Sequence, residues 1–143
     1  VRPHTTYFGL KEYQQAMIVK RMVQDLNFDV AVKLLPIVRE LGGLALSSRN
    51  AYLSKEERKR SLALSRALRW ARSEIRKGRP SLTALRKGVR SRLTPELSKI
   101  DYVEFVQAEN LQPVKALRGR LVLAIAGWVG KTRLIDNAII QLS

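Results

Sequence analysis

Apolar residues recur every three or four positions from residue 11 to residue 27, and this spacing predicts a helix with one buried face. A short run rich in Val and Leu, DVAVKLLP, follows at residues 29–36 and predicts a strand that ends at Pro36. The first third of the chain is therefore expected to form a strand–helix–strand segment of an α/β fold.

The middle of the chain predicts two further helices. Ser54 begins the first with the capping-box sequence SKEE, in which Glu57 reaches back to the cap, and Gly78 ends it. The second helix begins at Ser81 and runs to about Leu93. The first carries an apolar stripe at helical spacing, made of Leu62, Leu64, Ala67, Leu68, Ala71 and Ile75.

The last third changes to a two-residue alternation, which is typical of strands with one buried face. The sequence DYVEFVQA, at residues 101–108, predicts one such strand. Residues 120–126 and 132–140 predict two more, joined by a turn at residues 127–130. Three strands after two helices indicate a second, small α/β layer with an antiparallel sheet.

The sequence GWVGKT, from Gly127 to Thr132, is similar to a phosphate-binding loop. Such a loop needs a glycine, four further residues and then Gly-Lys-Ser/Thr, so that backbone N–H groups surround a phosphate. Ile125 stands where the first glycine is required, and the strand-like sequence RLIDNAII follows where a helix should begin. We interpret this stretch as a tight turn between two strands.

Composition narrows the class of protein. The chain has 143 residues, of which 45% are hydrophobic, which is enough for a packed core. The sequence contains no run of 18 apolar residues, so it predicts no membrane span. The absence of cysteine excludes disulfides and thiolate sites. With a single histidine, a histidine-rich metal site is also excluded. These features favour a cytoplasmic location.

The net charge of +15 is concentrated in the predicted helices. Residues 54–93 hold 14 Lys and Arg against 3 Glu, and such a surface can bind polyanions through release of counterions. The alternative is a solvated, arginine-rich helix surface. Trp70 is the only aromatic residue in this run, so stacking platforms for bases are missing and nucleic-acid binding is the less favoured interpretation.

Two polar groups flank the predicted strand at residues 29–36. In the first, FGLKEYQQ at residues 8–15, a small glycine precedes a lysine and a glutamate at a helix start, where backbone N–H groups attract anions. In the second, LALSSRN at residues 44–50, two hydroxyls and an arginine can bind phosphate oxygens. Each group alone also fits ordinary helix capping. Together they indicate two walls of a nucleotide site in a parallel sheet.

Four motifs together resemble the pantothenate synthetase (pantoate–β-alanine ligase) family. They are FGLKEYQQ, PIVRELGGLALSSRNAYLS, IDYVEFV and VGKTRLIDN, and the likeness covers essentially the whole chain in the right order. The resemblance implies that residues 1–50 end a Rossmann-like domain that binds ATP and pantoate. It implies that residues 51–143 form a C-terminal α/β lid domain with two or three helices and a three-stranded antiparallel sheet.

The resemblance also implies roles for individual residues. Gly9, through its backbone, and Glu12, through its carboxylate, match positions that hold the ribose of ATP. Lys11 matches the lysine that binds phosphates and stabilises charge during adenylation. Gln15 matches a glutamine that hydrogen-bonds pantoate, and Val38 matches a residue whose backbone meets adenine.

Three more residues, Ser47, Ser48 and Arg49, match the mobile loop that contacts the triphosphate, so the implied catalytic set is Lys11 with these three. Mg2+ is expected to accompany the phosphates. The chain departs from the family pattern at Glu12, where the family has aspartate, and at Gly43, which also replaces an aspartate. The first change lengthens the carboxylate arm, and the second removes a charge from the loop.

The implied reaction, in the pathway to coenzyme A, joins pantoate to β-alanine. A pantoyl adenylate forms from ATP with loss of pyrophosphate, and β-alanine then releases AMP and gives pantothenate. The family's N-terminal half, with its HxGH-type motif, is not in this sequence, so we expect the chain to be inactive alone. A separate N-terminal half or a second copy is an expected partner. Two alternatives stay open: a non-catalytic basic module for an anionic partner such as nucleic acid, and a purely structural half.

Overall fold

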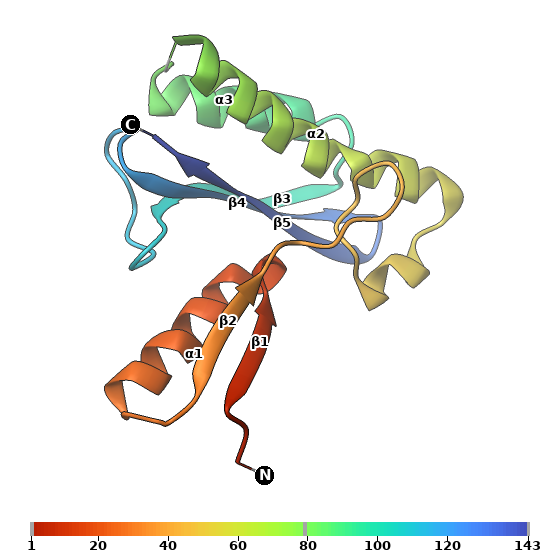
Figure 1. Ribbon diagram of the computed structural model, residues 1–143. Helices are drawn as coiled ribbons and strands as arrows, with labels where there is room; N and C mark the ends of the chain where they lie inside the picture. The colour runs from red at the N-terminus through yellow and green to blue at the C-terminus, as the bar shows by residue number, and fades with distance from the viewer. Residues whose placement is uncertain (1, 79, 143) are drawn as a thin grey trace. The chain divides into compact units, whose positions relative to one another are not determined.

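The computed structural model describes residues 2–78 and 80–142, and Figure 1 shows its helices and strands. The chain divides into two compact units, residues 1–38 and residues 39–143, and each is described by itself. Among the described residues, no helix is both long enough and apolar enough to cross a membrane.

The first unit is a strand–helix–strand segment, as the sequence predicts. Its strands are parallel and pair in register from Thr5 with Ala31 to Gly9 with Leu35. The helix connects them, and its buried residues are Tyr13 and Ala16. Its elements are β1 (Thr5–Gly9), η1 (Leu10–Glu12), α1 (Tyr13–Asp25) and β2 (Ala31–Leu35).

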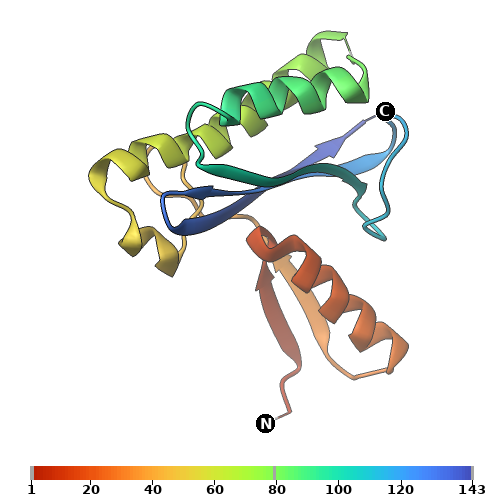
Figure 2. The same cartoon turned by 180° about the vertical axis from the view of Figure 1, so that it is seen from behind.

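The second unit is a three-stranded antiparallel sheet with two helices on one of its faces, and Figure 2 shows the same arrangement from behind. The strands lie in the order β3-β4-β5. Phe105, Leu85 and Leu64 are fully buried in the core between the layers. The elements are η2 (Ser48–Tyr52), α2 (Lys55–Gly78), α3 (Leu82–Leu93), β3 (Lys99–Gln107), β4 (Arg120–Val129) and β5 (Thr132–Gln141).

The predicted helix starts in this unit are confirmed at atomic detail. The backbone N–H of Ser54 donates to Glu57 Oε2 at 2.8 Å, and the N–H of Glu57 donates to Ser54 Oγ at 3.2 Å. This reciprocal pair satisfies two backbone donors that the first turn of α2 would otherwise leave unpaired. Ser81 caps α3 by accepting the N–H of Ala84 at 3.1 Å.

One predicted boundary is wrong. The sequence placed a turn at residues 127–130, but β4 continues to Val129 and the turn is the two-residue Gly130–Lys131 step. Gly127 lies inside the strand, and a Cβ there would clash with the Leu97 side chain and the Lys99 carbonyl oxygen. The glycine permits close packing rather than a change of chain direction. The interpretation of GWVGKT as a strand–turn–strand segment is confirmed.

The loop at residues 39–50 belongs to the second unit. The resemblance to the family implies a functional domain over residues 1–50, and that functional division stays a prediction. Side-chain bonds, described below, tie this loop to α2 and β5 and agree with the structural division at residue 38.

Candidate functional site

In the first unit, the predicted binding residues gather at one edge of the parallel strands. Gly9 ends β1 and pairs with Leu35, which ends β2, so the carboxyl ends of both strands lie at the same edge. Lys11 and Glu12 follow immediately in η1, and Val38 follows β2 by three residues. The carboxyl edge of parallel strands is where ligands bind in open α/β sheets.

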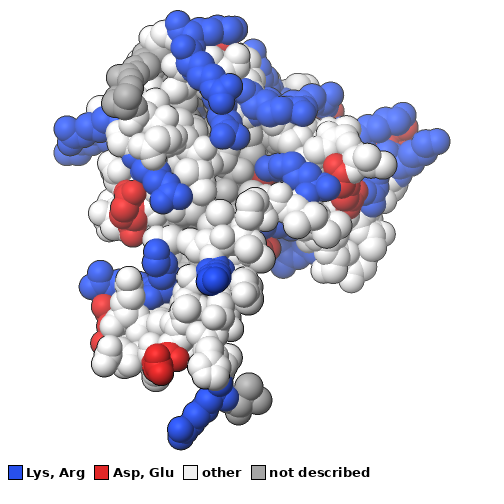
Figure 3. Space-filling view, viewed as in Figure 1, with Lys and Arg blue, Asp and Glu red and all other residues white. Residues whose placement is uncertain are grey.

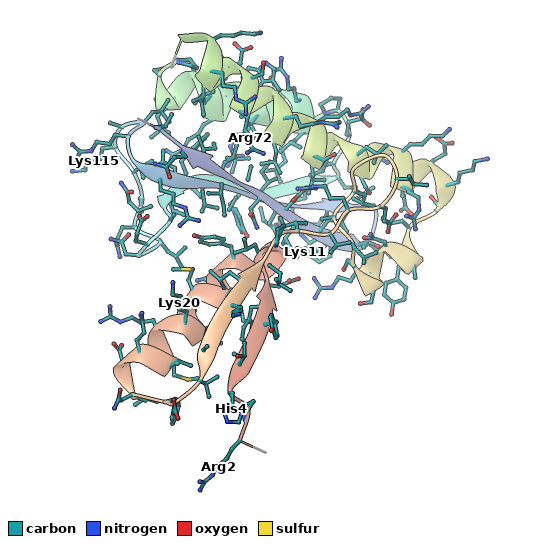
Figure 4. The ribbon with its side chains drawn as sticks, viewed as in Figure 1. Arg2, His4, Lys11, Lys20, Arg72 and Lys115 are labelled. Carbon is teal, nitrogen blue, oxygen red and sulfur yellow. The ribbon has the colours of Figure 1, made fainter. Side chains whose placement is uncertain are left out.

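The side chains at this edge differ in exposure: that of Lys11 is 12% exposed, and that of Glu12 is 51% exposed. Lys11 Nζ lies 4.0 Å from Glu12 Oε1, and Figure 4 shows Lys11 at the end of β1. Gln15 is exposed in the first turn of α1, and Val38 is 65% exposed. A Cβ at Gly9 would meet nothing within 4 Å, and its φ of −71° suits any residue. Neither packing nor backbone strain in this chain therefore explains the glycine.

In the second unit, Ser47, Ser48 and Arg49 lie at the start of η2. Ser47 is its N-cap and accepts the backbone N–H of Arg49 at 3.3 Å, while Ser48 and Arg49 are exposed. The short helix thus presents a hydroxyl and a guanidinium to solvent from a fixed turn. These are strong donors for phosphate oxygens.

A buried amide fixes the segment that carries these residues. Asn50 is 1% exposed, and its Nδ2 donates to Glu40 Oε1 at 2.6 Å and to the Ala45 carbonyl at 3.1 Å. Arg58 of α2 bonds to the other oxygen of Glu40 and donates to the Asn50 carbonyl at 3.0 Å. The loop is therefore attached to the first turns of α2.

A second anchor joins the loop to β5. Arg39 donates from both terminal nitrogens to the Asp136 carboxylate, at 2.8 and 2.9 Å, and from Nη1 to the Gly43 carbonyl at 2.9 Å. Asp136 is 3% exposed. Gly42 and Gly43 turn the loop sharply with φ of +96° and +101°, a conformation that glycine adopts readily.

Sequence reasoning missed the anchoring roles of Arg39, Glu40 and Asn50. The charged pair Arg39-Glu40 in PIVRELGG was the available signal, because two adjacent charges inside an otherwise apolar and glycine-rich loop need partners. The partners, Arg58 and Asp136, could not be identified without the fold.

η2 also forms one wall of an open pocket of about 880 Å3 within the second unit. Arg49 and Tyr52 line this wall, and the β4–β5 turn supplies Gly130 and Lys131. The pocket therefore connects a predicted phosphate-binding residue with the turn that is similar to a phosphate loop.

Two carboxylates near this pocket have lowered pKa values. The backbone N–H and hydroxyl of Ser54 hold the pKa of Glu57 below its usual range. The Arg133 guanidinium, with further help from the Trp128 indole N–H, lowers the pKa of Asp101. Arg133 Nε donates to Asp101 Oδ2 at 2.7 Å and Trp128 Nε1 to Oδ1 at 3.1 Å. Both groups are thus held as anions by local donors.

The structure brings the predicted residues together in two groups. Gly9, Lys11, Glu12, Gln15 and Val38 lie at one end of the first unit, and the residues of η2 lie in the second. Among residues 2–78 and 80–142, no cluster of three or more His, Asp or Glu side chains is placed to hold a metal ion.

The family of this chain is shown by its similarity to known proteins. The sequence model of the pantoate-β-alanine ligase family matches residues 1–139. The pantothenate synthetase of Moorella thermoacetica is 46% identical over 145 residues, covering 100% of this chain and 51% of that protein. The pantothenate synthetase of Pseudothermotoga lettingae is 50% identical over 141 residues, covering 98% of this chain and 50% of that protein.

Solved structures agree with the sequence comparison. The crystal structure of pantothenate synthetase from Thermus thermophilus superposes with a TM-score of 0.88 and 42% identity, over 94% of this chain and 49% of that one. The pantoate-β-alanine ligase from Francisella tularensis, complexed with β,γ ATP and β-alanine, superposes with a TM-score of 0.60 and 28% identity. The match covers 96% of this chain and 44% of that one. The chain spans about half the length of the curated relatives it matches. With the family match over nearly its whole length, this chain belongs to the pantoate-β-alanine ligase family.

Proposed function

We propose that this chain is the C-terminal part of an ATP-dependent ligase that joins pantoate and β-alanine. The observation that carries the proposal is the gathering of Gly9, Lys11, Glu12 and Val38 at the carboxyl edge of β1 and β2. A lysine ammonium close to a glycine at this edge suits the phosphates of a nucleotide. The Francisella relative, whose structure holds β,γ ATP and β-alanine, supports ATP as the substrate.

The first step activates pantoate. A carboxylate oxygen of pantoate attacks the α-phosphorus of ATP, and the bond from this phosphorus to the oxygen of the β-phosphate breaks. Pyrophosphate leaves, and the pantoyl adenylate remains. Negative charge grows on the phosphate oxygens during this attack, so the Lys11 ammonium stabilises the transition state more than the ground state. The Gln15 amide hydrogen-bonds pantoate and aligns its carboxylate.

The second step transfers the acyl group. The amine nitrogen of β-alanine attacks the acyl carbon, the bond to the AMP oxygen breaks, and the amine loses a proton. The backbone of Gly9 and the carboxylate of Glu12 hold the ribose, while the backbone of Val38 meets adenine. These contacts to the ribose and adenine hold the AMP leaving group in place during the attack.

The η2 residues take the phosphate chain in this proposal. Ser47, Ser48 and Arg49 donate hydrogen bonds to the triphosphate, and the anchored loop gives them a defined position. Mg2+ would be bound mainly by phosphate oxygens, because the described residues offer no carboxylate cluster for it. The metal supplies further charge neutralisation.

The first unit needs a covering partner. Parallel strands occur almost only in sheets with both faces covered, and a sheet of two strands is marginally stable. Large apolar side chains stay exposed in this unit, among them Ile18, Met22, Leu26 and Phe28. We therefore assign the missing surface to an N-terminal half of the enzyme, encoded with this chain or separately, or brought by a homodimer.

The test measures AMP release from ATP with pantoate and β-alanine, for the chain alone and mixed with an N-terminal half from a family member. We expect AMP release only in the mixture. Lys11→Ala should lower kcat by about 10²-fold or more, because one charge-stabilising donor is lost. Lys20→Ala, the matched control, removes the same charge from α1 (Figure 4) and should leave kcat within about twofold.

Each outcome of this test separates the candidates. Equal rates for Lys11→Ala and the unsubstituted chain would remove the assigned role of Lys11. AMP release by the chain alone would show that the N-terminal half is dispensable. A folded chain with no AMP release in either setting would favour the non-catalytic functions.

The second candidate function is a basic module for an anionic partner. Arg69, Arg72 and Arg76 are exposed on one side of α2, and Figure 3 shows Lys and Arg crowded over the α2–α3 layer. Duplex DNA at low salt tests this function, since binding through phosphates weakens steeply as salt rises. No binding at about 20 mM salt would exclude it.

A further inference from the structure

The pocket beside the β4–β5 turn joins segments that are far apart in sequence. Arg49 and Tyr52 of η2 line it together with Gly130 and Lys131 of the turn, because η2 packs against β5. The proposed function uses only Arg49 from this set. The sequence GWVGKT is not a phosphate loop, yet its lysine lies in the same pocket as a residue assigned to phosphate.

Positive charge dominates the lining of the pocket. Arg49, Lys131 and Arg133 each contribute one cation. Arg133 is engaged by the Asp101 carboxylate at 2.7 Å. Within the part of the chain that the structure describes, no ion pair engages the side chain of Arg49 or of Lys131. Two cations are therefore available to an anionic ligand.

One carboxylate, Glu57, also lines the pocket, and it is occupied elsewhere. Its Oε2 accepts the Ser54 N–H at 2.8 Å, and its Oε1 lies where a side chain at Gly130 would have to go. The Glu57 carboxylate is thus hydrogen-bonded to the start of α2 and lies against Gly130 of the turn. The lining as a whole keeps a positive charge.

The turn presents Lys131 from a rigid base. Val129 and Thr132 pair with each other across it, and both are buried. The backbone N–H of Gly130 donates to Ser98 Oγ at 3.0 Å. The Gly130 N–H is therefore engaged within the chain, and the flexible ammonium of Lys131 is the group that we expect to contact an anion.

We propose that this pocket receives the β- and γ-phosphates of ATP, and pyrophosphate after its release, with Lys131 as a second cationic contact beside Arg49. The inference rests on the proposed function, which assigns Arg49 to the triphosphate. Pyrophosphate fits because it is small and multiply charged, and two separated cations can bind different oxygens of it. Lys131 is thus a binding residue for the leaving group.

The test titrates the 143-residue chain with inorganic pyrophosphate at constant ionic strength and follows the heat of binding. Lys131→Gln should raise the Kd about tenfold, through loss of one charge-assisted contact. Lys115→Gln is the matched control, since it removes the same charge from the β3–β4 loop at the far end of the sheet (Figure 4). β4, which is about 30 Å long, lies between the loop that carries Lys115 and the turn that carries Lys131. The control should change Kd by less than about twofold.

Arg49→Gln separates this inference from the proposed function. If it weakens pyrophosphate binding while Lys131→Gln acts no differently from Lys115→Gln, the role of Lys131 is overturned and that of Arg49 stands. If only Lys131→Gln weakens binding, the pocket is supported and the assignment of Arg49 fails. Absence of pyrophosphate binding to the unsubstituted, folded chain overturns the pocket as a phosphate site.

NMR locates the bound anion. Trp128 lines the pocket, whereas Trp70 lies on α2. The guanidinium carbon of Arg92, on α3, lies 3.7 Å from the centroid of the Trp70 ring. Pyrophosphate should shift the indole N–H signal of Trp128 and leave that of Trp70 unchanged. A shift of the Trp70 signal alone would place the anion on the basic helices and overturn the assignment.

Discussion

Gly130 occupies a position where a side chain would meet two separate obstacles. Its φ is +57°, a left-handed conformation that costs an alanine about 1 kcal/mol. A Cβ would also clash with Glu57 Oε1. We expect Gly130→Ala to displace the Glu57 carboxylate and weaken its bond to the Ser54 N–H, which would lower the free energy of unfolding beyond the backbone cost.

Gly119→Ala provides the matched comparison for this prediction. Gly119 has a φ of +70°, but a Cβ there would meet nothing within 4 Å. Urea unfolding of both variants should give a loss of about 1 kcal/mol for Gly119→Ala and a larger loss for Gly130→Ala. Equal losses would mean that Glu57 moves aside without consequence.

The ion pair between Arg39 and Asp136 predicts a larger effect. The Asp136 side chain is 2% exposed and that of Arg39 is 32% exposed, so removal of the carboxylate leaves a largely desolvated guanidinium. Asp136→Ala should lower the free energy of unfolding by about 2–4 kcal/mol, measured by urea denaturation. Lys59→Ala breaks an exposed pair with Glu56 and should cost less than about 0.5 kcal/mol. Similar losses in both variants would contradict the anchoring role.

At the residue scale, the sequence points to candidate chemical groups through local motifs, but it does not show which residues hold those motifs in place. Lys11 and Arg49 stand in local motifs whose spacing can be read directly. Arg39 and Asp136 are 97 residues apart, and only the packing of the loop against β5 brings them together. No local pattern encodes that separation.

At the scale of elements, a β-bulge places Asp101 among its partners. The register between β3 and β4 shifts between Ile100 and Tyr102, so Asp101 has no direct partner across the sheet. Its carboxylate instead meets Arg133 of β5 and Trp128 of β4. One unpaired residue thus links all three strands, which is the kind of side-chain redirection that bulges provide.

This cluster predicts a pH-dependent stability. The pKa of Asp101 is lowered in the folded chain, chiefly by Arg133, so its stabilising effect is present above its unfolded pKa and is lost as pH falls through the folded value. Asp101→Asn should lower the urea midpoint clearly at about pH 7, and the difference should shrink below about pH 3. An equal loss at both pH values would show that the carboxylate charge does not contribute.

Element types were predictable because periodicity and capping agree with the tertiary packing. The capping box at Ser54 and the cap at Ser81 set helix starts that the structure reproduces. The end of β4 was not predictable, because a glycine that permits close packing and a glycine that permits a turn look the same in sequence. The close contact with Leu97 marks Gly127 and the φ of +57° marks Gly130, and neither feature can be read from the sequence.

At the scale of the whole molecule, the chain combines a well-packed unit with an incompletely covered one. The extended hydrophobic core, from Leu44 to Leu142, belongs to the second unit. In the first unit, the buried hydrophobic residues among those described are Tyr13 and Ala16. Local stability follows buried apolar contacts, so the two units should open with different free energies.

Hydrogen exchange followed by mass spectrometry measures this difference. Amides of α1, Tyr13–Asp25, should exchange at least about tenfold faster than those of α2, Lys55–Gly78, because opening the first unit exposes little apolar surface. An added N-terminal half should slow exchange in α1 and β2 while leaving α2 unchanged, since it covers exposed side chains such as Ile18 and Phe28. Equal protection of α1 and α2 in the isolated chain would mean that the first unit is already complete, and would remove the structural reason for a partner.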